Sequence, residues 1–192
     1  MPDTDAEKWN AIYAAGGHTR DEPAKVLREF AYLLPVSGTA LELACGGGAN
    51  ALFLAGKGLD VHAWDISKEA IASLHTRAND LHLTLETRIC DVTADPPSAD
   101  SFDIIVVSYF LERELIPKII NALRRNGLLF YQTFIRDRNN DTGPHNNKYR
   151  LAENELLHLC HNLHIVLYHE EGMIGNTQQG FRNEAMLIGQ RR

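Results

Sequence analysis

Cysteines are scarce in this sequence of 192 residues, and their arrangement suggests neither a cross-link nor a metal centre. There are three, Cys45, Cys90 and Cys160, and no two of them form a CxxC pair. A disulfide framework is typical of an even set of cysteines in a short secreted chain, and a structural zinc site needs closely spaced ligands. We therefore expect a reduced protein that holds no metal.

Long apolar runs and an excess of positive charge are missing as well. No apolar stretch approaches the roughly 20 residues of a membrane-spanning helix, and residues 1–10 lack the apolar core of a signal peptide. The chain has 19 basic and 25 acidic residues, a net charge of −6, whereas proteins that bind nucleic acid normally show a basic face. We expect a cytoplasmic monomer or homodimer that binds neither nucleic acid nor a membrane.

Strand-like and helix-like segments alternate along the middle of the chain. Strands are expected at residues 39–43, 59–64, 83–89, 103–108 and 128–134, and helices at residues 49–56, 67–79, 114–125 and 153–160. Two later strands, 164–169 and 184–189, have no helical pattern between them, which favours an antiparallel pair at a sheet edge. The pattern predicts an α/β fold: a Rossmann-like, doubly wound, mostly parallel seven-stranded sheet with an antiparallel C-terminal strand pair.

Two helices are expected before the first strand. The first covers residues 3–15 and is capped by Thr4 or Asp5. The second is capped by Asp21, has Pro23 in its first turn and continues to residue 34. Together they could serve as a lid over a site at the carboxyl ends of the strands.

A glycine-rich turn follows the first expected strand, in the segment Glu42-Leu43-Ala44-Cys45-Gly46-Gly47-Gly48. Glycines permit positive φ and let a ligand approach the backbone, and the next helix presents unpaired N–H groups at its start. Those donors suit a phosphate, and they also suit the carboxylate of an amino acid. The spacing Gly46-x-Gly48-x-x-Ala51 satisfies the dinucleotide fingerprint too, so the glycines alone leave the ligand open.

Three carboxylates at the ends of successive expected strands narrow this choice. Glu42 precedes the turn, where its charge would repel a pyrophosphate and attract a sulfonium and an ammonium group. Asp65 comes 19 residues (65 − 46) after Gly46, near the spacing of about 20 at which an acid reaches ribose hydroxyls. Asp91 follows the third strand, where it can accept from an adenine amino group. Each acid alone could be a turn or cap residue, but the set favours S-adenosylmethionine.

These features together resemble the class I S-adenosylmethionine-dependent methyltransferases over residues 41–134. The resemblance is carried by Glu42-x-Ala44-x-Gly46-x-Gly48, Asp65, Asp91 and Phe102-Asp103-Ile104-Ile105. Further motifs resemble the small tellurite-resistance-type and thiopurine-type methyltransferases: Phe110-Leu111-Glu112-Arg113, Gly143-Pro144 and Asn154-Glu155-Leu156-Leu157. Many members have glycine where this chain has Ala44, and since alanine is the smallest alternative we expect binding to be kept.

The resemblance implies that S-adenosylmethionine is the cofactor, and it implies which residues would contact each part of it. Glu42 would hold the methionine end, Asp65 the ribose diol, and Ser108 and Tyr109 would lie near the donor methyl. The other residues implied in cofactor binding are Trp9, Tyr13 and Arg20 as a cover, Ala44, Cys45, Gly46, Gly48 and Asn50 at the turn, Ile66 on the adenine, and Asp91 and Val92 at the adenine edge.

The expected activity is in-line methyl transfer to a small-molecule acceptor. Acceptor contacts are expected from Arg113, Arg136, Tyr149 and Arg182, because arginines suit an anionic or polar acceptor. No residue stands out as a general base, so no catalytic residue is assigned, and thiols, metalloid oxyanions and small metabolites all remain open as acceptors. Two alternatives also stay open: an NAD-dependent oxidoreductase that uses the same turn, and a non-catalytic protein that binds S-adenosylmethionine.

We expect one class I methyltransferase domain over residues 1–192. Residues 1–37 would form the N-terminal helical cover, residues 38–134 the cofactor-binding core, and residues 135–192 the acceptor-side segment.

Overall fold

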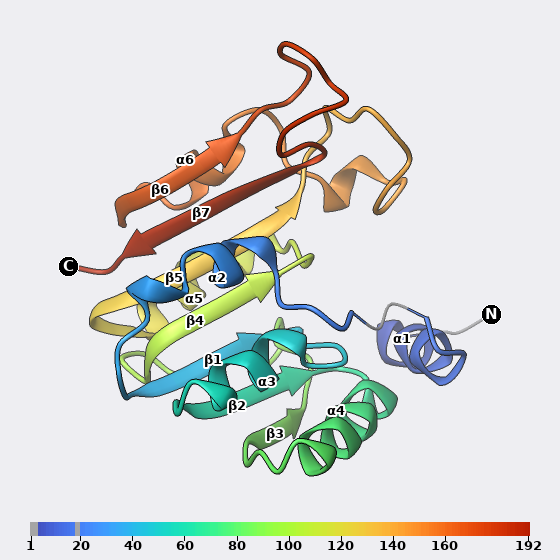
Figure 1. The fold of residues 1–192 in the computed structure, drawn as a ribbon, viewed down its shortest axis with the longest axis vertical. Helices are drawn as coiled ribbons and strands as arrows, with labels where there is room; N and C mark the ends of the chain where they lie inside the picture. Colours follow the sequence, from blue (N-terminus) through green and yellow to red (C-terminus); the bar gives the residue numbers. More distant parts are fainter. Residues whose placement is uncertain (1–3, 18–19) are drawn as a thin grey trace.

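Seven strands form one sheet in the computed structural model, which describes residues 4–17 and 20–192. The strand order is β3-β2-β1-β4-β5-β7-β6; β7 is antiparallel to its neighbours β5 and β6, and the other pairs are parallel (Figure 1). The strands are β1 (Thr39–Leu43), β2 (Asp60–Asp65), β3 (Glu86–Ile89), β4 (Phe102–Ser108), β5 (Leu123–Phe134), β6 (His164–Glu170) and β7 (Glu184–Gln190). The predicted mostly parallel seven-stranded sheet with an antiparallel C-terminal pair is confirmed.

Helices cover both faces of this sheet (Figure 1). One face carries α2 (Lys25–Glu29), α3 (Ala49–Gly56) and α4 (Lys68–Asp80), and the other carries α5 (Ile116–Ala122) and α6 (Glu155–Leu159). The central strand β4 contributes alternate residues to the two apolar cores, Ile104 and Val106 to the first and Ile105 and Val107 to the second. Its wholly apolar run therefore reflects burial on both sides.

The N-terminal helix α1 (Asp5–Ala14) lies beyond the carboxyl ends of β1 and β2 (Figure 1). A capping box holds its first turn, because Thr4 Oγ1 accepts from the N–H of Glu7 and Glu7 Oε2 accepts from the N–H of Thr4. Asn10 Oδ1 accepts a 2.9 Å hydrogen bond from Ser67 Oγ, which fastens α1 to the start of α4. The first predicted helix is confirmed with Thr4 as its cap; residue 3 lies outside the described residues.

The second predicted helix is shorter than expected, and the prediction that Asp21 caps it is wrong. Helix α2 begins after Ala24, whose N–H donates a 2.7 Å hydrogen bond to Asn50 Oδ1. After Phe30 the chain continues as a 3-10 turn, η1 (Ala31–Leu33), instead of an α-helix. In the first turn of α2 the N–H of Val26 donates a 2.7 Å hydrogen bond to Gln132 Oε1 of β5, so a side chain distant in sequence, and not Asp21, satisfies this donor.

Strand pairing also moves two predicted boundaries. The helix expected to reach residue 125 ends at Ala122, because Leu123 already pairs with Phe102 as the first residue of β5. The third strand was expected to begin at residue 83, but it begins three residues later, at Glu86. From this residue onward it pairs with β2. None of the helices in the described residues is long and apolar enough to cross a membrane.

Candidate functional site

The turn between β1 and α3 lies at the carboxyl edge of the sheet. Ala44, Gly46 and Gly48 have left-handed φ angles of 52°, 52° and 73°. A Cβ on Gly46 would lie 2.3 Å from the hydroxyl oxygen of Tyr13, so a side chain here would displace Tyr13 and strain the left-handed backbone. Ala44 adopts the same conformation at a cost of roughly 1–2 kcal/mol. The turn therefore brings bare backbone directly beneath a side chain of α1.

Glu42 lies buried at the end of β1 and joins this strand to α3. Its Oε1 accepts from Asn50 Nδ2 and its Oε2 accepts from the N–H of Ala51, each at 2.7 Å. Burial raises the pKa of Glu42 to about 8, although the two hydrogen bonds oppose that rise. Both carboxyl oxygens are engaged by α3, so Glu42 ties the end of β1 to the start of α3 on either side of the turn.

Asp65 plays a similar part at the end of β2. Its Oδ2 accepts a 2.7 Å hydrogen bond from the N–H of Gly46, and its Oδ1 accepts a 2.8 Å bond from the N–H of Ser67. Burial raises the pKa of Asp65, against the effect of these backbone donors. The predicted proximity of this carboxylate to the glycine turn is therefore present in the structure.

Asn50 connects three parts of the chain from the first turn of α3. Its Nδ2 donates to Glu42 Oε1 at 2.7 Å and to Ser108 Oγ at 2.9 Å, while its Oδ1 accepts from the N–H of Ala24. All of its polar atoms are engaged and the side chain is buried. The amide therefore links β1, β4 and the start of α2 around the turn.

The N-terminal segment supplies a cover for the turn. The ring of Tyr13 lies 6.1 Å from that of Trp9, and its hydroxyl reaches Gly46. Burial raises the pKa of Tyr13 far above its ordinary value, and the nearby Asp65 carboxylate adds to the rise. Helix α1 therefore packs against the glycine turn, and its role as a lid stays a prediction.

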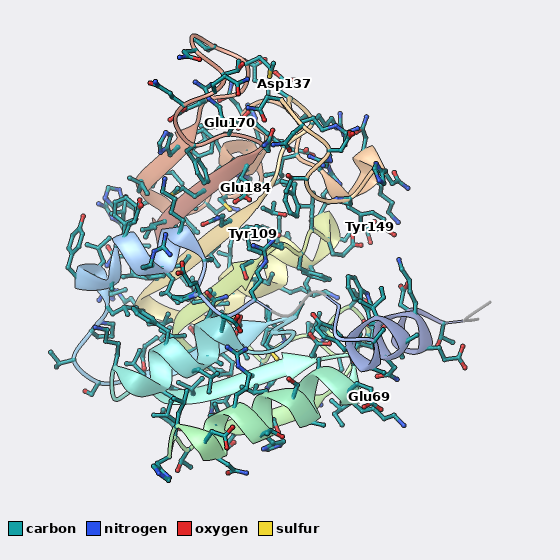
Figure 2. All side chains as sticks on the ribbon, turned by 45° about the vertical axis from the view of Figure 1, so that its right-hand side comes forward. Glu69, Tyr109, Asp137, Tyr149, Glu170 and Glu184 are labelled. Atoms are coloured by element: carbon teal, nitrogen blue, oxygen red, sulfur yellow. The ribbon has the colours of Figure 1, made fainter. Side chains whose placement is uncertain are left out.

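A second polar network lies beside the turn and joins four segments. The Arg20 guanidinium stacks 3.6 Å from the ring centre of Tyr109, which follows β4. Gln132 Nε2 donates to Tyr109 Oη at 3.0 Å and to Glu184 Oε2 at 2.6 Å, and Tyr109 Oη donates to the same oxygen at 3.3 Å. Figure 2 shows Tyr109 and Glu184 close together near the middle of the molecule. Burial raises the pKa of Tyr109 to about 12.

Gln132 and Glu184 are residues of this site that the sequence analysis missed. Gln132 is a buried amide inside the apolar strand β5, and Glu184 is an acid at the start of the apolar strand β7. A polar residue within a strand that is otherwise buried was the available signal. Its partners could not be named before the strand order was known.

The adenine-side residues are more dispersed. Asp91 is exposed, and its Oδ1 accepts from the N–H and the Oγ1 of Thr93, two bonds that lower the pKa of Asp91. Val92 beside it is buried, and Ile66 after β2 is half-buried. The structure thus places Asp91 in a local turn, with only its neighbour Val92 packed into the core.

Of the four expected acceptor contacts, Arg113 lies beside Tyr149, since it donates to the carbonyls of Lys148 and Arg150, whereas Arg182 is held in the loop between β6 and β7. Arg113 is bound by Glu155 at 2.6 and 2.9 Å and by two backbone carbonyls, and Arg182 donates to carbonyls of its own loop, including Gly172 at 2.9 Å. Arg136 is exposed, and Tyr149 is 42% exposed and lies apart from Tyr109 (Figure 2). Loop carbonyls thus occupy donors of Arg113 and Arg182, and a role of the four residues in acceptor binding stays a prediction.

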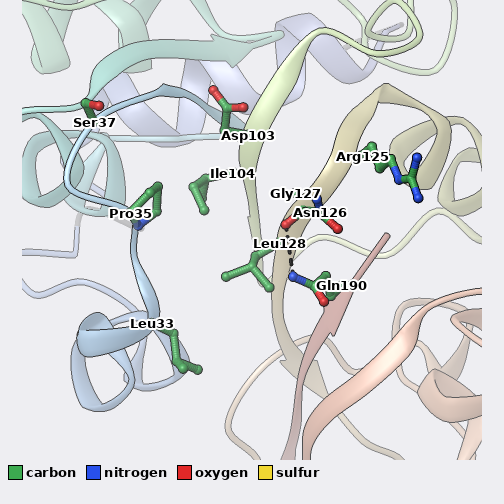
Figure 3. Close-up of a pocket in the computed structure, with 10 residues that line it drawn as sticks. All are labelled: Leu33, Pro35, Ser37, Asp103, Ile104, Arg125, Asn126, Gly127, Leu128 and Gln190. Carbon is green, nitrogen blue, oxygen red and sulfur yellow. Dashed lines mark hydrogen bonds between the residues drawn. The ribbon is translucent and has the colours of Figure 1, made fainter. Parts of the chain in front are cut away.

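Two surface pockets lie elsewhere. One, of about 370 Å³, is lined by Glu170, Glu171, Ile174 and Arg182. The other, also about 370 Å³, lies at the amino end of the sheet, where Gln190 Nε2 donates to the carbonyl of Asn126 (Figure 3). In the described part of the chain, no group of three or more His, Cys, Asp or Glu side chains could hold a metal ion.

Comparison with known sequences identifies a family and several relatives. Residues 19–184 match the family described as tellurite resistance protein TehB. A probable S-adenosyl-L-methionine-dependent methyltransferase TehB of Haemophilus influenzae is 35% identical over 89 residues, which are 45% of this chain and 31% of the relative. The matched part thus spans about a third of that relative's length.

Solved structures resemble the fold over nearly the whole chain. TehB from Haemophilus influenzae has a TM-score of 0.72 at 22% identity, covering 96% of this chain and 67% of that chain. A TehB-like S-adenosylmethionine-dependent methyltransferase from Corynebacterium glutamicum has a TM-score of 0.65 at 18% identity, covering 97% of this chain and 96% of that chain. At these identities the likeness concerns the fold, and it confirms the Rossmann-like class.

Proposed function

The chain belongs to the tellurite resistance protein TehB family, and from this premise we propose that it is an S-adenosylmethionine-dependent methyltransferase. We propose further that it acts on a small-molecule acceptor by in-line transfer. The single observation that carries the proposal is the turn at Gly46, which has Asp65 hydrogen-bonded to it, Glu42 beneath it and Tyr13 above it.

The residues around the turn fit such a cofactor chemically. A backbone without a Cβ at Gly46 permits close approach by a ligand. Burial disfavours the ionised forms of Glu42 and Asp65, and a positively charged ligand beside them would stabilise those forms, whereas a pyrophosphate would disfavour them further. This electrostatic difference is the reason for preferring S-adenosylmethionine to NAD, although the glycine spacing suits both.

We assign residues to the parts of the cofactor on this basis. Asp65 and Ile66 would hold the ribose and adenine, with Asp91 and Val92 at the adenine edge. Glu42 and Asn50 would keep the turn in shape, while Ser108 and Tyr109 would lie at the methyl end. The backbone of Ala44, Cys45, Gly46 and Gly48 would pass under the ligand, and Trp9, Tyr13 and Arg20 would cover it.

When bound, S-adenosylmethionine supplies a methyl group that its positive sulfur already activates. The protein's part is then chiefly alignment, which can lower a barrier by roughly 7–11 kcal/mol. Tyr13 and Arg20 would exclude water from the turn, and Tyr109 would orient the acceptor. We propose that residues 1–37 are the cover, residues 38–134 the cofactor-binding core and residues 135–192 the acceptor side of one cytoplasmic domain.

Thermal unfolding with S-adenosylmethionine, S-adenosylhomocysteine or NAD tests the proposal. At a ligand concentration of 100 times Kd, binding adds about 2.7 kcal/mol, which raises Tm by roughly 5–10 °C for a chain of this size. Asp65→Ala should abolish the shift. Asp60→Ala, an exposed acid on the same strand, should keep it.

Three results separate the alternatives. A shift with NAD and none with either adenosyl compound would favour the oxidoreductase. Ligand binding without methylation of thiols, amines, hydroxyls or oxyanions would favour a non-catalytic binding protein. An unchanged shift in Asp65→Ala would show that the cofactor binds elsewhere.

A further inference from the structure

Arg20 keeps the N–H donors of its guanidinium available beside the proposed site. The guanidinium carbon lies 3.6 Å from the ring centre of Tyr109, the residue that follows β4. Such stacking uses the face of the guanidinium and leaves the N–H groups at its edge for other partners. Within residues 4–17 and 20–192, no group accepts a hydrogen bond from this guanidinium and no carboxylate forms an ion pair with it. A positively charged fork of donors is therefore open to a ligand.

Three arginines of the C-terminal half differ from Arg20 in this respect. Arg113 donates to both carboxyl oxygens of Glu155 and to two backbone carbonyls. Arg182 donates to carbonyls of its own loop, and the buried Arg150 donates to three carbonyls of the segment before it. The protein itself thus occupies the donors of these three side chains, whereas it leaves those of Arg20 unused.

The charge of Arg20 acts on groups from three separate segments. Burial raises the pKa values of these groups and the positive charge of Arg20 opposes each rise; they are Tyr13, Tyr109 and Glu184. Tyr13 lies over Gly46 of the glycine turn, and Glu184 is the first residue of β7. Arg20 therefore lies between the proposed cofactor site and the proposed acceptor side.

Glu184 does not pair directly with Arg20. Its Oε2 accepts from Gln132 Nε2 at 2.6 Å and from Tyr109 Oη at 3.3 Å, and Figure 2 shows Tyr109 and Glu184 close together. The Oε1 atom of Gln132 accepts a 2.7 Å hydrogen bond from the N–H of Val26, which fixes the amide. Because burial favours the neutral form of Glu184, its repulsion of an anion is reduced. The network holds Tyr109 in place as the surface on which the guanidinium rests.

Arg77 of α4 fixes the backbone of Arg20 relative to the glycine turn. Its Nη1 donates to the carbonyl of Gly47 at 2.8 Å and to the carbonyl of Arg20 at 3.1 Å. Its Nη2 lies 3.7 Å from the exposed carboxylate of Asp21. One side chain thus joins the end of the N-terminal cover to the turn, so the position of Arg20 depends on it.

We propose that Arg20 is a specificity-determining residue of the acceptor site, which binds the negative charge of an oxyanion acceptor through its free N–H donors, and that Arg77 positions it. The inference rests on the proposed function. A planar fork of donors matches two oxygens of one oxyanion. Arg20 forms no covalent bond and moves no proton; it holds the acceptor beside Tyr109, at the methyl end of the proposed cofactor site.

Arg20→Gln removes the charge and keeps a polar side chain. In the presence of S-adenosylhomocysteine, we expect selenite to bind this variant roughly 10- to 100-fold more weakly than the wild type in calorimetry. The KM for selenite should rise by a similar factor while kcat changes little, because binding and not the methyl transfer is affected. Arg125→Gln is the matched control: Arg125 is exposed at the amino end of the sheet (Figure 3), and this variant should bind selenite as the wild type does.

A double-mutant cycle tests the positioning role of Arg77. Arg77→Gln should weaken selenite binding roughly threefold to tenfold, and this loss should disappear in the Arg20→Gln background, because Arg77 acts through Arg20. Arg77→Lys keeps a charged donor for the two carbonyls and should recover most of the affinity. Losses that multiply in the double variant would overturn the positioning role.

The carboxylate of the cofactor offers Arg20 the same chemistry as an oxyanion, and two ligands separate these sources. Methylthioadenosine lacks the amino-acid part of S-adenosylhomocysteine, and we expect both to bind Arg20→Gln as tightly as they bind the wild type. Weaker binding of S-adenosylhomocysteine alone would assign Arg20 to the cofactor and overturn the inference. Selenite binding that is absent from the wild type, or unchanged in Arg20→Gln, would overturn it too. These results leave the methyltransferase proposal standing, which fails only if the wild type does not bind S-adenosylmethionine.

Discussion

The buried carboxyl group of Glu42 should make the ligand-free protein less stable as the pH rises toward 8. Its pKa is raised from 4.5 to about 8 by burial, against the hydrogen bonds from Asn50 and Ala51. A carboxyl group with a raised pKa in the folded state stabilises the fold below the pKa of the unfolded chain, and this contribution is lost as the pH rises through the folded pKa. The sensitive range therefore extends from about pH 4.5 to about pH 8.

The size of the effect follows from the two pKa values. For Glu42 alone, linkage gives a loss of roughly 3 kcal/mol in the free energy of unfolding between pH 5 and pH 8. Burial also raises the pKa values of Asp65 and Glu184, so both add to the fall. Glu42→Gln removes the titration and leaves one of two N–H donors without an acceptor, which costs about 1–3 kcal/mol at pH 5.

Urea unfolding followed by tryptophan fluorescence at several pH values measures this slope, since Trp64 is buried and Trp9 lies in α1. The wild type should lose stability steeply over the range, and Glu42→Gln should give a flatter line. Glu114→Gln changes an exposed acid to its amide and should follow the wild type. Parallel lines for wild type and Glu42→Gln would refute the reasoning.

Two further predictions concern the turn and the long loop. Gly46→Ala places a Cβ against Tyr13 at a left-handed φ, so we expect a loss of about 1–2 kcal/mol in stability and at least tenfold weaker S-adenosylmethionine binding by calorimetry. Gly56→Ala meets open space and is the control; unchanged affinity in Gly46→Ala would contradict the placement of the site. Arg113→Ala removes the pair with Glu155 and should cost roughly 2 kcal/mol and speed proteolysis of residues 135–150. Equal cleavage rates would contradict that role.

The main elements of the fold could be read from the sequence because their signals are local. The apolar run of β4 and the glycines after β1 depend on neighbouring residues. The resemblance to tellurite-resistance-type methyltransferases, drawn from short motifs such as Phe110-Leu111-Glu112-Arg113, is confirmed by the family match. The helix ends were less predictable. The first turn of α2 donates to Gln132 of β5, and α5 stops where Leu123 enters the sheet.

The residues of the site also fall into those that local sequence signals predict and those that only tertiary contacts determine. The sequence by itself determined the turn and the acids Glu42 and Asp65, since strand ends of a parallel sheet meet at one edge whatever the loops do. Only the tertiary structure decided which long side chains keep hydrogen-bond donors available to a ligand. Arg113, for example, donates to a backbone carbonyl and to the carboxylate of Glu155, both distant in sequence. The tertiary structure also brought Glu184 to Tyr109, across 75 positions of the chain, through a strand order that no local pattern specifies.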